Sequence, residues 1–252
     1  KLKILVTNDD GIFSSGIYAL WEVAKEFGNV TLVAPSTQKS AVGHGITITN
    51  PIYVREIERN DSCKGFAVSG TPADCIKIGV KSILPSLPDL ILSGINIGSN
   101  LGNNIIYSGT VAAAVEGATL GIPSIAISID SYNPVSFETS KTVVRKVIKL
   151  LLKNTLPIGT LLNVNIPHCK PKDLKGYKVT MQGRQYFNDS FDKRIDPRGQ
   201  PYYWMTGEMI DNDKTLKYDG FAVSNGYASI TPINFEMTNV DFVDELNRVI
   251  TK

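Results

Sequence analysis

The sequence predicts an open α/β structure built on a mostly parallel sheet. Short apolar runs recur along the chain, and several lack the polar alternation of half-exposed strands, which is typical of strands buried on both faces of a parallel sheet. Helical patterns lie between these runs, and strands that alternate with helices favour right-handed crossovers within one sheet. The predicted strands cover residues 4–6, 30–33, 66–68, 90–92, 125–127 and 161–166.

Four helices are predicted between the strands. Thr71 and Pro72 supply a suitable N-cap and first residue for the second helix. The Ala-rich third helix covers residues 110–120 and stops before a Gly-Ile-Pro sequence. Apolar residues three or four positions apart mark the other two, namely Ile17, Leu20, Trp21, Ala24 and Phe27 in the first and Val143, Val147 and Leu151 in the fourth.

The pattern changes after residue 182, so we predict a core over residues 1–182 and a C-terminal part over residues 183–252 that packs on it. Residues 184–198 hold seven charges before a Pro-Arg-Gly break, which indicates a long hairpin or arm. Residues 227–232 are a late strand. A capping box at residues 238–241 then opens a terminal helix. One face of that helix carries Val240, Val243, Leu246 and Ile250.

Exposed aromatic residues on the arm predict self-association. Between Arg184 and Trp204 six of 21 residues are aromatic, against 8% in the whole chain. A monomer would leave many of them on a projecting arm, and large exposed apolar patches usually mark interfaces. We therefore expect a homodimer or homotetramer, with the arm as one contact and the terminal helix as another.

Composition excludes several classes of partner. Lys and Arg number 26 against 24 Asp and Glu, so a net charge of +2 gives no support for binding a nucleic acid polymer. No apolar run approaches the roughly 20 residues of a membrane helix, and the first run is too short for a signal peptide. The three cysteines fit neither a disulfide framework nor a zinc site, so we expect reduced thiols and a cytoplasmic location.

Two adjacent carboxylates, Asp9 and Asp10, follow the first predicted strand, where open α/β sheets bind ligands. Two like charges so close raise each other's pKa unless a cation lies between them. Gly11 comes next and permits a turn that other residues resist. The pair therefore favours a metal site, although one carboxylate capping the next helix and the other facing water is an alternative.

Ser40 and Asn96 follow two other predicted strands and add neutral oxygens. With the two carboxylates they make a hard oxygen set that fits Mg²⁺ or Mn²⁺ better than Zn²⁺. We predict one divalent metal ion per subunit, held by Asp9, Asp10, Ser40 and Asn96. Taken alone, a single Ser or Asn is an ordinary turn residue. The glycine- and asparagine-rich sequence around Asn96 could also have a purely structural role, because Asn tolerates unusual backbone angles.

Ser108, Gly109 and Thr110 open the Ala-rich helix, whose first turn offers free N–H groups and the positive end of a dipole. Beside a metal site this turn is better explained as a phosphate cradle than as a plain N-cap. His44 follows Gly43 in a loop near Ser40, where it could contact the phosphate or the leaving group. A solvent-exposed loop histidine is the alternative.

Taken together, these motifs resemble the SurE family, the survival-protein-E nucleotidases. The matches occur in family order over nearly the full length. They are residues 7–11, Ala34-Pro35 with Ser40, and residues 70–75, 93–100, 107–114, 163–167, 196–199 and 226–232. One departure is Tyr218-Asp219, where many members carry Thr-Asp, and it puts only the contacts of that loop in doubt.

The resemblance implies a three-layer, Rossmann-like catalytic core and a C-terminal part used for dimer and tetramer assembly. It implies a metal-dependent phosphatase for nucleoside 5′- and 3′-monophosphates, and short polyphosphate as a further substrate. The family's metal ligands match Asp9, Asp10, Ser40 and Asn96, and its phosphate turn matches Ser108, Gly109 and Thr110. We add Asn8 as a phosphate contact, and Gly43 with His44 as substrate contacts.

The expected chemistry is attack of a metal-activated water on the phosphorus, with the turn at residues 108–110 stabilising charge on the phosphate oxygens. Asp9 and Asp10 are the catalytic residues. Asp9 orients or deprotonates the water, and Asp10 is mainly a ligand. A covalent aspartyl-phosphate stays open. A non-catalytic nucleotide-binding regulatory module is the alternative function, whereas an NAD enzyme is disfavoured because no Gly-x-Gly-x-x-Gly follows the first strand.

Overall fold

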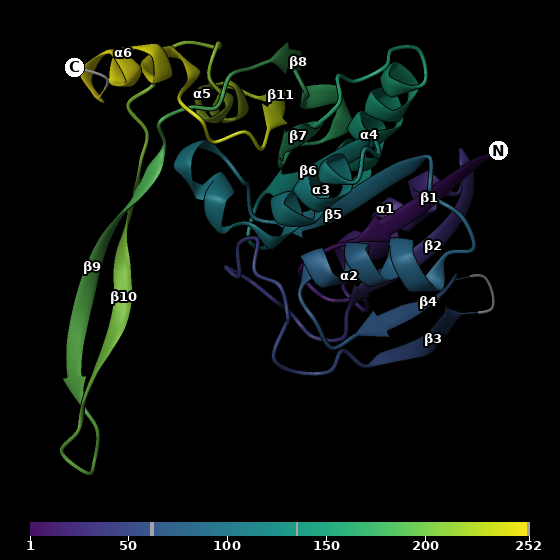
Figure 1. The fold of residues 1–252 in the computed structure, drawn as a ribbon, viewed down its shortest axis with the longest axis horizontal. Coiled ribbons are helices and arrows are strands. Elements are labelled where there is room, and N and C mark those ends of the chain that lie inside the picture. Colours follow the sequence, from purple (N-terminus) through teal and green to yellow (C-terminus); the bar gives the residue numbers. More distant parts are fainter. Residues whose placement is uncertain (61–62, 135, 251–252) are drawn as a thin grey trace.

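A nine-stranded sheet forms the centre of the computed structural model, which describes residues 1–60, 63–134 and 136–250. Its strands are β1 (Leu2–Thr7), β2 (Gly28–Pro35), β3 (Val54–Asn60), β4 (Cys63–Val68), β5 (Leu90–Ile97), β6 (Ser124–Asp130), β7 (Thr160–Pro167), β8 (Gly176–Val179) and β11 (Tyr227–Asn234). They are ordered β3-β4-β2-β1-β5-β6-β7-β11-β8 (Figure 1). Strands β4, β2, β1, β5, β6 and β7 are mutually parallel, whereas β3 and β11 run antiparallel to β4 and β7. The predicted α/β class is confirmed.

Helices cover both faces of the sheet and make three layers. On one face α1 (Ser15–Ala24) packs beside α4 (Glu138–Leu151), and on the other α2 (Pro72–Ile78) packs beside α3 (Gly109–Thr119). In β1, Ile4 and Val6 belong to the first core and Leu5 to the second, and all three are at most 1% exposed. Because both faces are buried, the central strands show no polar alternation.

Capping residues place most helix starts where the sequence predicts them. Thr71 and Asp74 form a complete capping box at α2, with Pro72 as the first helical residue. The prediction for the first helix was wrong at its end, because α1 stops at Ala24 and Phe27 packs on the core from the next turn. The capping box predicted at residues 238–241 lies one residue too early for α6 (Val240–Ile250). The helix is capped by Asn239, whose side chain accepts from the Phe242 N–H at 3.2 Å.

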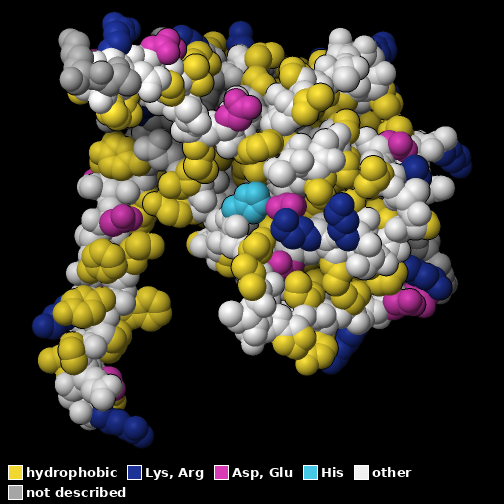
Figure 2. Space-filling view, viewed as in Figure 1, with side chains coloured by type: hydrophobic (Ala, Val, Ile, Leu, Met, Phe, Trp, Pro, Cys, Tyr) yellow, Lys and Arg dark blue, Asp and Glu magenta, His cyan; other side chains and the backbone are white. Residues whose placement is uncertain are grey.

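A long hairpin extends away from the sheet (Figure 1). It comprises β9 (Tyr186–Ile195) and β10 (Pro201–Ile210), paired antiparallel over their whole length. At its tip Asp196 accepts from the N–H groups of Arg198 and Gln200, both at 2.8 Å. Figure 2 shows hydrophobic side chains along much of this arm. The exposed ones include Phe191, Tyr202, Tyr203 and Trp204, as expected for an arm.

The remaining C-terminal elements divide between the core and the surface. Strand β11 lies between β7 and β8, and the short helix α5 (Asp219–Ser224) packs against it. The apolar face of α6 is exposed, with Val240, Val243, Leu246 and Ile250 between 42% and 72% accessible. The division of the chain into a core over residues 1–182 and a C-terminal part over residues 183–252 stays a prediction. Among the described residues, no helix has the length and apolar character needed to cross a membrane.

Candidate active site

Polar residues from distant parts of the chain meet at the carboxyl edge of the parallel strands. Asp9 and Asp10 follow β1, Ser40 lies beyond β2, and Asn96 is near the end of β5. A cleft of about 280 Å³ opens there, and its lining includes Asp9, Ser40, Asn96 and Ser108. We call it the carboxylate cleft. The structure therefore brings together three of the four predicted metal ligands and the start of the predicted phosphate turn.

Asp9 lies directly against the N-terminus of α3. Its Oδ1 accepts from the Thr110 hydroxyl at 2.5 Å, and the residue is only 5% exposed. Burial raises the pKa of Asp9 to about 6, while hydrogen bonds from Thr110 act in the opposite direction and the charge of Asp10 adds to the rise. Thr110 thus holds Asp9 in place. The dipole of α3 favours the carboxylate there.

Gly109 makes this contact between helix and carboxylate possible. A Cβ at this position would lie 2.9 Å from the Asp9 Cβ and 3.1 Å from its Oδ2. It would also lie 3.1 Å from the Cγ of Pro72. The glycine is needed where α3 approaches β1, a reason additional to the predicted clearance for phosphate.

Asp10 lies beside Asp9 but does not line the carboxylate cleft. Its Oδ2 accepts from the Ile97 N–H at 3.2 Å, which directs it toward the end of β5. Burial raises the pKa of this half-buried carboxyl. Asn96 precedes Ile97 on β5, and its Nδ2 donates to the Gly98 carbonyl at 2.6 Å. This bond leaves the Asn96 side-chain oxygen as the group available to a cation.

Ser40 lies on an exposed loop that is fastened to the Asp9 turn. The Lys39 N–H donates to the Asp9 carbonyl at 2.7 Å, and Gln38 Nε2 donates to the Ser40 hydroxyl oxygen at 2.8 Å. The loop can approach because Gly11 (φ +95°) comes close to the backbone of Gln38. Ser40 is therefore positioned by the backbone contacts of its loop and by the Gln38 side chain.

The remaining predicted phosphate contacts serve the local structure. The Ser108 hydroxyl oxygen accepts from the Val111 N–H at 3.1 Å and caps α3. Asn8 is fully buried and donates from Nδ2 to the Gly11 carbonyl at 3.0 Å and to the Ser14 hydroxyl at 2.8 Å. These bonds hold the turn that carries the two aspartates, and phosphate binding by either residue stays a prediction.

His44 points to a different part of the surface. Its Nε2 lies 3.0 Å from Oε2 of Glu116, a buried residue of α3 that also pairs with Lys77 at 2.7 Å. The contacts to His44 and Lys77 lower the pKa of Glu116. His44 lines an apolar hollow of about 380 Å³ beside α3, which we call the His44 hollow. Gly43 is closer to the site, because its N–H donates to the Tyr107 carbonyl at 3.0 Å.

Two positioning residues of the cleft were not predicted individually. Asn165, fully buried in β7, accepts from the Asn100 N–H at 2.7 Å and donates to its carbonyl at 3.0 Å. Asn163 donates to the same carbonyl at 2.8 Å. These bonds fix the end of the loop after β5 that lines the cleft. Two asparagines alternating within an otherwise apolar strand were the available signal.

Asp219 belongs to the Tyr218-Asp219 pair, where this sequence departs from the family pattern. Its side chain connects three separate pieces of backbone. This fully buried carboxylate accepts from the N–H groups of Gly102, Gly183 and Gly220 at 3.1, 2.9 and 2.8 Å. It thereby connects the start of the 3₁₀ helix η2 (Gly102–Tyr107) to the segment that leads into the hairpin. The structure gives Asp219 no bond that depends on the side chain of Tyr218.

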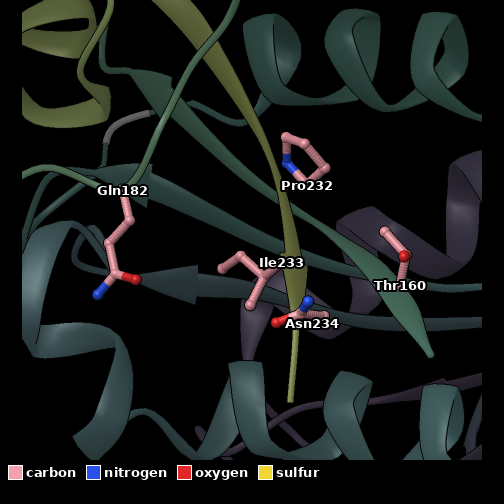
Figure 3. A pocket seen from close by; sticks show the side chains of 5 residues that line it. All are labelled: Thr160, Gln182, Pro232, Ile233 and Asn234. Atoms are coloured by element: carbon pink, nitrogen blue, oxygen red, sulfur yellow. The ribbon is translucent and has the colours of Figure 1, made fainter. Parts of the chain in front are cut away.

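Another hollow, of about 330 Å³, lies beside the end of β11. Figure 3 shows its lining, which is Thr160, Gln182, Pro232, Ile233 and Asn234. None of these five side chains is a carboxylate, a thiol or an imidazole, so the hollow has no side chain for acid–base catalysis and no anionic ligand for a metal. The carboxylate cleft is the candidate active site.

Residues 4–189 match the family model described as survival protein SurE. The chain belongs to the SurE family. It is 43% identical over 247 residues to a 5′-nucleotidase SurE of Syntrophobacter fumaroxidans, which covers 98% of this chain and 99% of the relative. A 5′-nucleotidase SurE of Thermosipho melanesiensis is 44% identical, with 97% and 96% covered.

A solved SurE structure has the same fold. The crystal structure of the SurE protein from Aquifex aeolicus superposes with a TM-score of 0.85 at 41% identity, covering 98% of this chain and 99% of that one. The SurE family model ends at residue 189, within β9, whereas the similarity to these full-length relatives continues through the hairpin and β11. The predicted family is confirmed.

Proposed function

We propose that this SurE protein is a 5′-nucleotidase that hydrolyses nucleoside 5′-monophosphates with a divalent cation bound in the carboxylate cleft. The nucleotidase activity is supported by relatives of that name at about 43% identity over nearly the whole chain. The single structural observation that carries the proposal is the contact between the Asp9 carboxylate and the N-terminus of α3. The Asp9 carboxylate and an anion-binding helix start then share one cleft, with Asp10 next to Asp9 at its edge.

The residues of the cleft fit a hard divalent cation. Asp9, Asp10, Ser40 and Asn96 offer only oxygen donors, the kind that Mg²⁺ and Mn²⁺ prefer. Two adjacent, partly desolvated carboxylates, both with raised pKa, are unfavourable without a cation. No cluster of three or more His, Cys, Asp or Glu suited to a metal occurs in the described part of the chain, so this mixed set is the better candidate.

The protein's own groups then have distinct roles in phosphate ester hydrolysis. A bound divalent cation supplies a Lewis acid and lowers the pKa of a water molecule. Thr110 fixes the Asp9 carboxylate, which would orient the attacking water and accept its proton. As the new P–O bond forms, the ester P–O bond breaks and the nucleoside oxygen leaves with a proton from solvent. Asp10, held by the Ile97 N–H, is mainly a ligand. At the start of α3, the Gly109 N–H and the Ser108 hydroxyl bind phosphate oxygens and stabilise their charge.

The same site accounts for further substrates. Because the recognised group is a terminal phosphate, we propose that nucleoside 3′-monophosphates and short polyphosphate are also hydrolysed. The cleft is open at the molecular surface, so a longer chain of phosphates has access. A non-catalytic nucleotide-binding module is less well supported, because binding alone does not need two desolvated carboxylates beside the phosphate turn.

The protein is proposed to act as a homodimer or homotetramer in the cytoplasm. The exposed apolar side chains of the hairpin and of α6 support assembly with further copies of the chain. The thiols of Cys63, Cys75 and Cys169 are free, and unpaired cysteines are usual in a reducing compartment.

A substrate panel tests the proposed function. Phosphate release is measured from AMP, 3′-AMP and tripolyphosphate after EDTA treatment and after return of Mg²⁺ or Mn²⁺. We expect hydrolysis of AMP that EDTA abolishes and a divalent cation restores. Hydrolysis that persists at the full rate in EDTA contradicts metal dependence, and binding of AMP without phosphate release with any cation supports the regulatory module instead.

A further inference from the structure

A large cavity adjoins the carboxylate cleft between η2 and the base of the hairpin. It measures about 690 Å³, which lies within the range of about 300–1,000 Å³ for small-molecule sites. Ala41, Asn104 and Tyr107 line both this space and the carboxylate cleft. A ligand whose phosphate lies in the cleft can therefore extend directly into the second space, which we call the hairpin cavity.

The hairpin supplies a flat apolar wall to this cavity. Its lining includes Tyr186, Phe187, Met205 and Met209. Phe187 and Met209 are directly paired across the two strands, so their side chains share one face. A Cβ at Gly207 would lie 2.9 Å from Cε1 of Phe187, so this glycine leaves room for the aromatic ring over β10. Aromatic rings and thioethers are well suited to stacking on a planar heterocycle.

The opposite wall supplies polar groups. This wall comes from η2 and is lined by Asn103, Asn104 and Tyr107. On the side of the hairpin, Asp189 adds a carboxylate. These side chains offer both donors and acceptors to ring nitrogens, exocyclic groups or sugar hydroxyls. An apolar stacking surface facing a few polar groups is the usual composition of a small-molecule site.

Hydrogen bonds hold the two walls together. The Asn103 N–H donates to the Gln185 carbonyl at 2.8 Å, and Asn104 Nδ2 lies 3.2 Å from the Met209 sulfur. Below them, Asp219 binds the N–H groups of both Gly102 and Gly183. The base of the hairpin is thus fastened to η2, and the cavity is formed before any ligand binds.

We propose that the nucleoside half of the substrate lies in the hairpin cavity, with its base against the ring of Phe187. This inference rests on the proposed nucleotidase function and assigns the substrate's base to a segment outside the carboxylate cleft. The hairpin then recognises the substrate at its base and, as proposed above, contacts further copies of the chain toward its tip.

The His44 hollow is the competing place for the base. It shares only Ser108 with the carboxylate cleft, against three residues for the hairpin cavity. Much of its wall is aliphatic, from Val111, Val115 and Ile233, and the Ser108 hydroxyl already caps α3. A phenyl ring in its lining, that of Phe235, provides a variant that separates the two places.

The test compares AMP with ribose 5-phosphate, which has the same phosphate and sugar but no base. Phe187→Ala should lower the ratio of kcat/KM for AMP to kcat/KM for ribose 5-phosphate at least about 10-fold, the effect of losing one base–aromatic stack. The change should lie in KM for AMP, and the inhibition constant of adenosine should rise in parallel. Phe187→Tyr should restore most of the ratio.

Matched controls separate recognition from structure. Phe191→Ala removes the same ring four residues further along the same face of the hairpin. Phe191 pairs with Met205 but does not itself line the cavity, so this variant should keep the wild-type ratio. The mass from light scattering is measured for each variant. If Phe187→Ala does not fold, Phe187→Leu and Met209→Ala replace it, with the same fall in ratio expected.

Two results would overturn the inference while leaving the nucleotidase function intact. One is an unchanged ratio in the Phe187 variants of a protein that hydrolyses both substrates. The other is a fall in the ratio for Phe235→Ala instead, which would place the base in the His44 hollow. A wild-type protein that hydrolyses neither substrate in Mn²⁺ would overturn both the inference and the proposed function.

Discussion

Single residues at the start of α3 determine how the helix meets the carboxylates. Thr110 donates to Asp9, and Gly109 has no side chain where one would press on Asp9 and Pro72. From the sequence, both residues were predicted to serve the phosphate. Neither the contact to Asp9 nor its distance could be predicted, since the two segments are about 100 residues apart and meet only when β1 and α3 pack.

Gly109→Ala should impair catalysis by displacing Asp9. The new Cβ would lie 2.9 Å from the Asp9 Cβ, so the carboxylate has to shift. A small displacement of a reacting group lowers the rate by about 10- to 100-fold, and we expect this loss mainly in kcat. Steady-state kinetics with AMP measure it, with circular dichroism as the folding control. Wild-type kcat in a folded variant would mean that Asp9 needs no such clearance.

Glu116→Gln should change how stability depends on pH. The contacts of Glu116 with His44 and Lys77 lower its pKa in the folded protein below the ordinary value of 4.5. A carboxyl with a lowered folded pKa adds stability above its unfolded pKa and loses it as pH falls through the folded pKa. The wild type should therefore lose stability more steeply than Glu116→Gln below pH 4.5. Urea midpoints between pH 3 and pH 7 would show parallel curves if the ion pairs contribute nothing.

At the scale of elements, the buried strands and the exposed hairpin were predictable, whereas the two edge strands of the sheet were not. The apolar runs of β1, β2, β4, β5, β6 and β7 were found because burial on both faces leaves a continuous apolar signal. Strands β3 and β8 were missed, since one is largely charged and the other has four partly exposed residues. The position of β11 between β7 and β8 depends on pairing across the sheet, which no local pattern encodes.

The site was predictable to a similar extent. Polar clusters at strand ends correctly indicated that Asp9, Ser40 and Asn96 share one cleft. The substrate contact predicted for His44 from its glycine-flanked loop stays a prediction, whereas its contact with Glu116, 72 residues away, was not foreseen. Such side-chain partners depend on the packing of whole elements and are not visible in a sequence motif.

Asn165→Ala tests how β7 supports the loop of the cleft. The Asn165 side chain makes two bonds to the backbone of Asn100, and both groups are buried. Asn163 still donates to the Asn100 carbonyl in this variant, so only the buried Asn100 N–H loses its partner. One unsatisfied buried group costs about 1–3 kcal/mol, and the free energy of unfolding should fall by about that amount. Urea denaturation measures it, with the exposed Asn154→Ala as control. Equal stability of the two variants would show that water replaces Asn165.

For the whole molecule, apolar surface on the hairpin and on α6 predicts assembly. Replacing residues 190–206 with Asn-Gly keeps the pairs from Tyr186–Ile210 to Asp189–Gly207 and closes them with a two-residue turn. This variant loses Phe191, Tyr202, Tyr203 and Trp204, and of the residues that line the hairpin cavity it loses only Met205. We expect a lower oligomeric state by light scattering, with phosphatase activity retained. A mass near 27.5 kDa for the full-length protein would contradict assembly.

The most direct test of a metal-dependent site at Asp9 and Asp10 is phosphate release from AMP by Asp10→Asn at low Mn²⁺. The substitution keeps the shape of the side chain but removes one charge from the proposed ligand set. We predict a folded protein whose activity falls by at least about 10²-fold, as expected for loss of a group that stabilises transition-state charge. Asp173→Asn, on the exposed turn η3 (Pro171–Asp173), is the control. A rate near that of the wild type at the same low Mn²⁺ would contradict the assignment of the site.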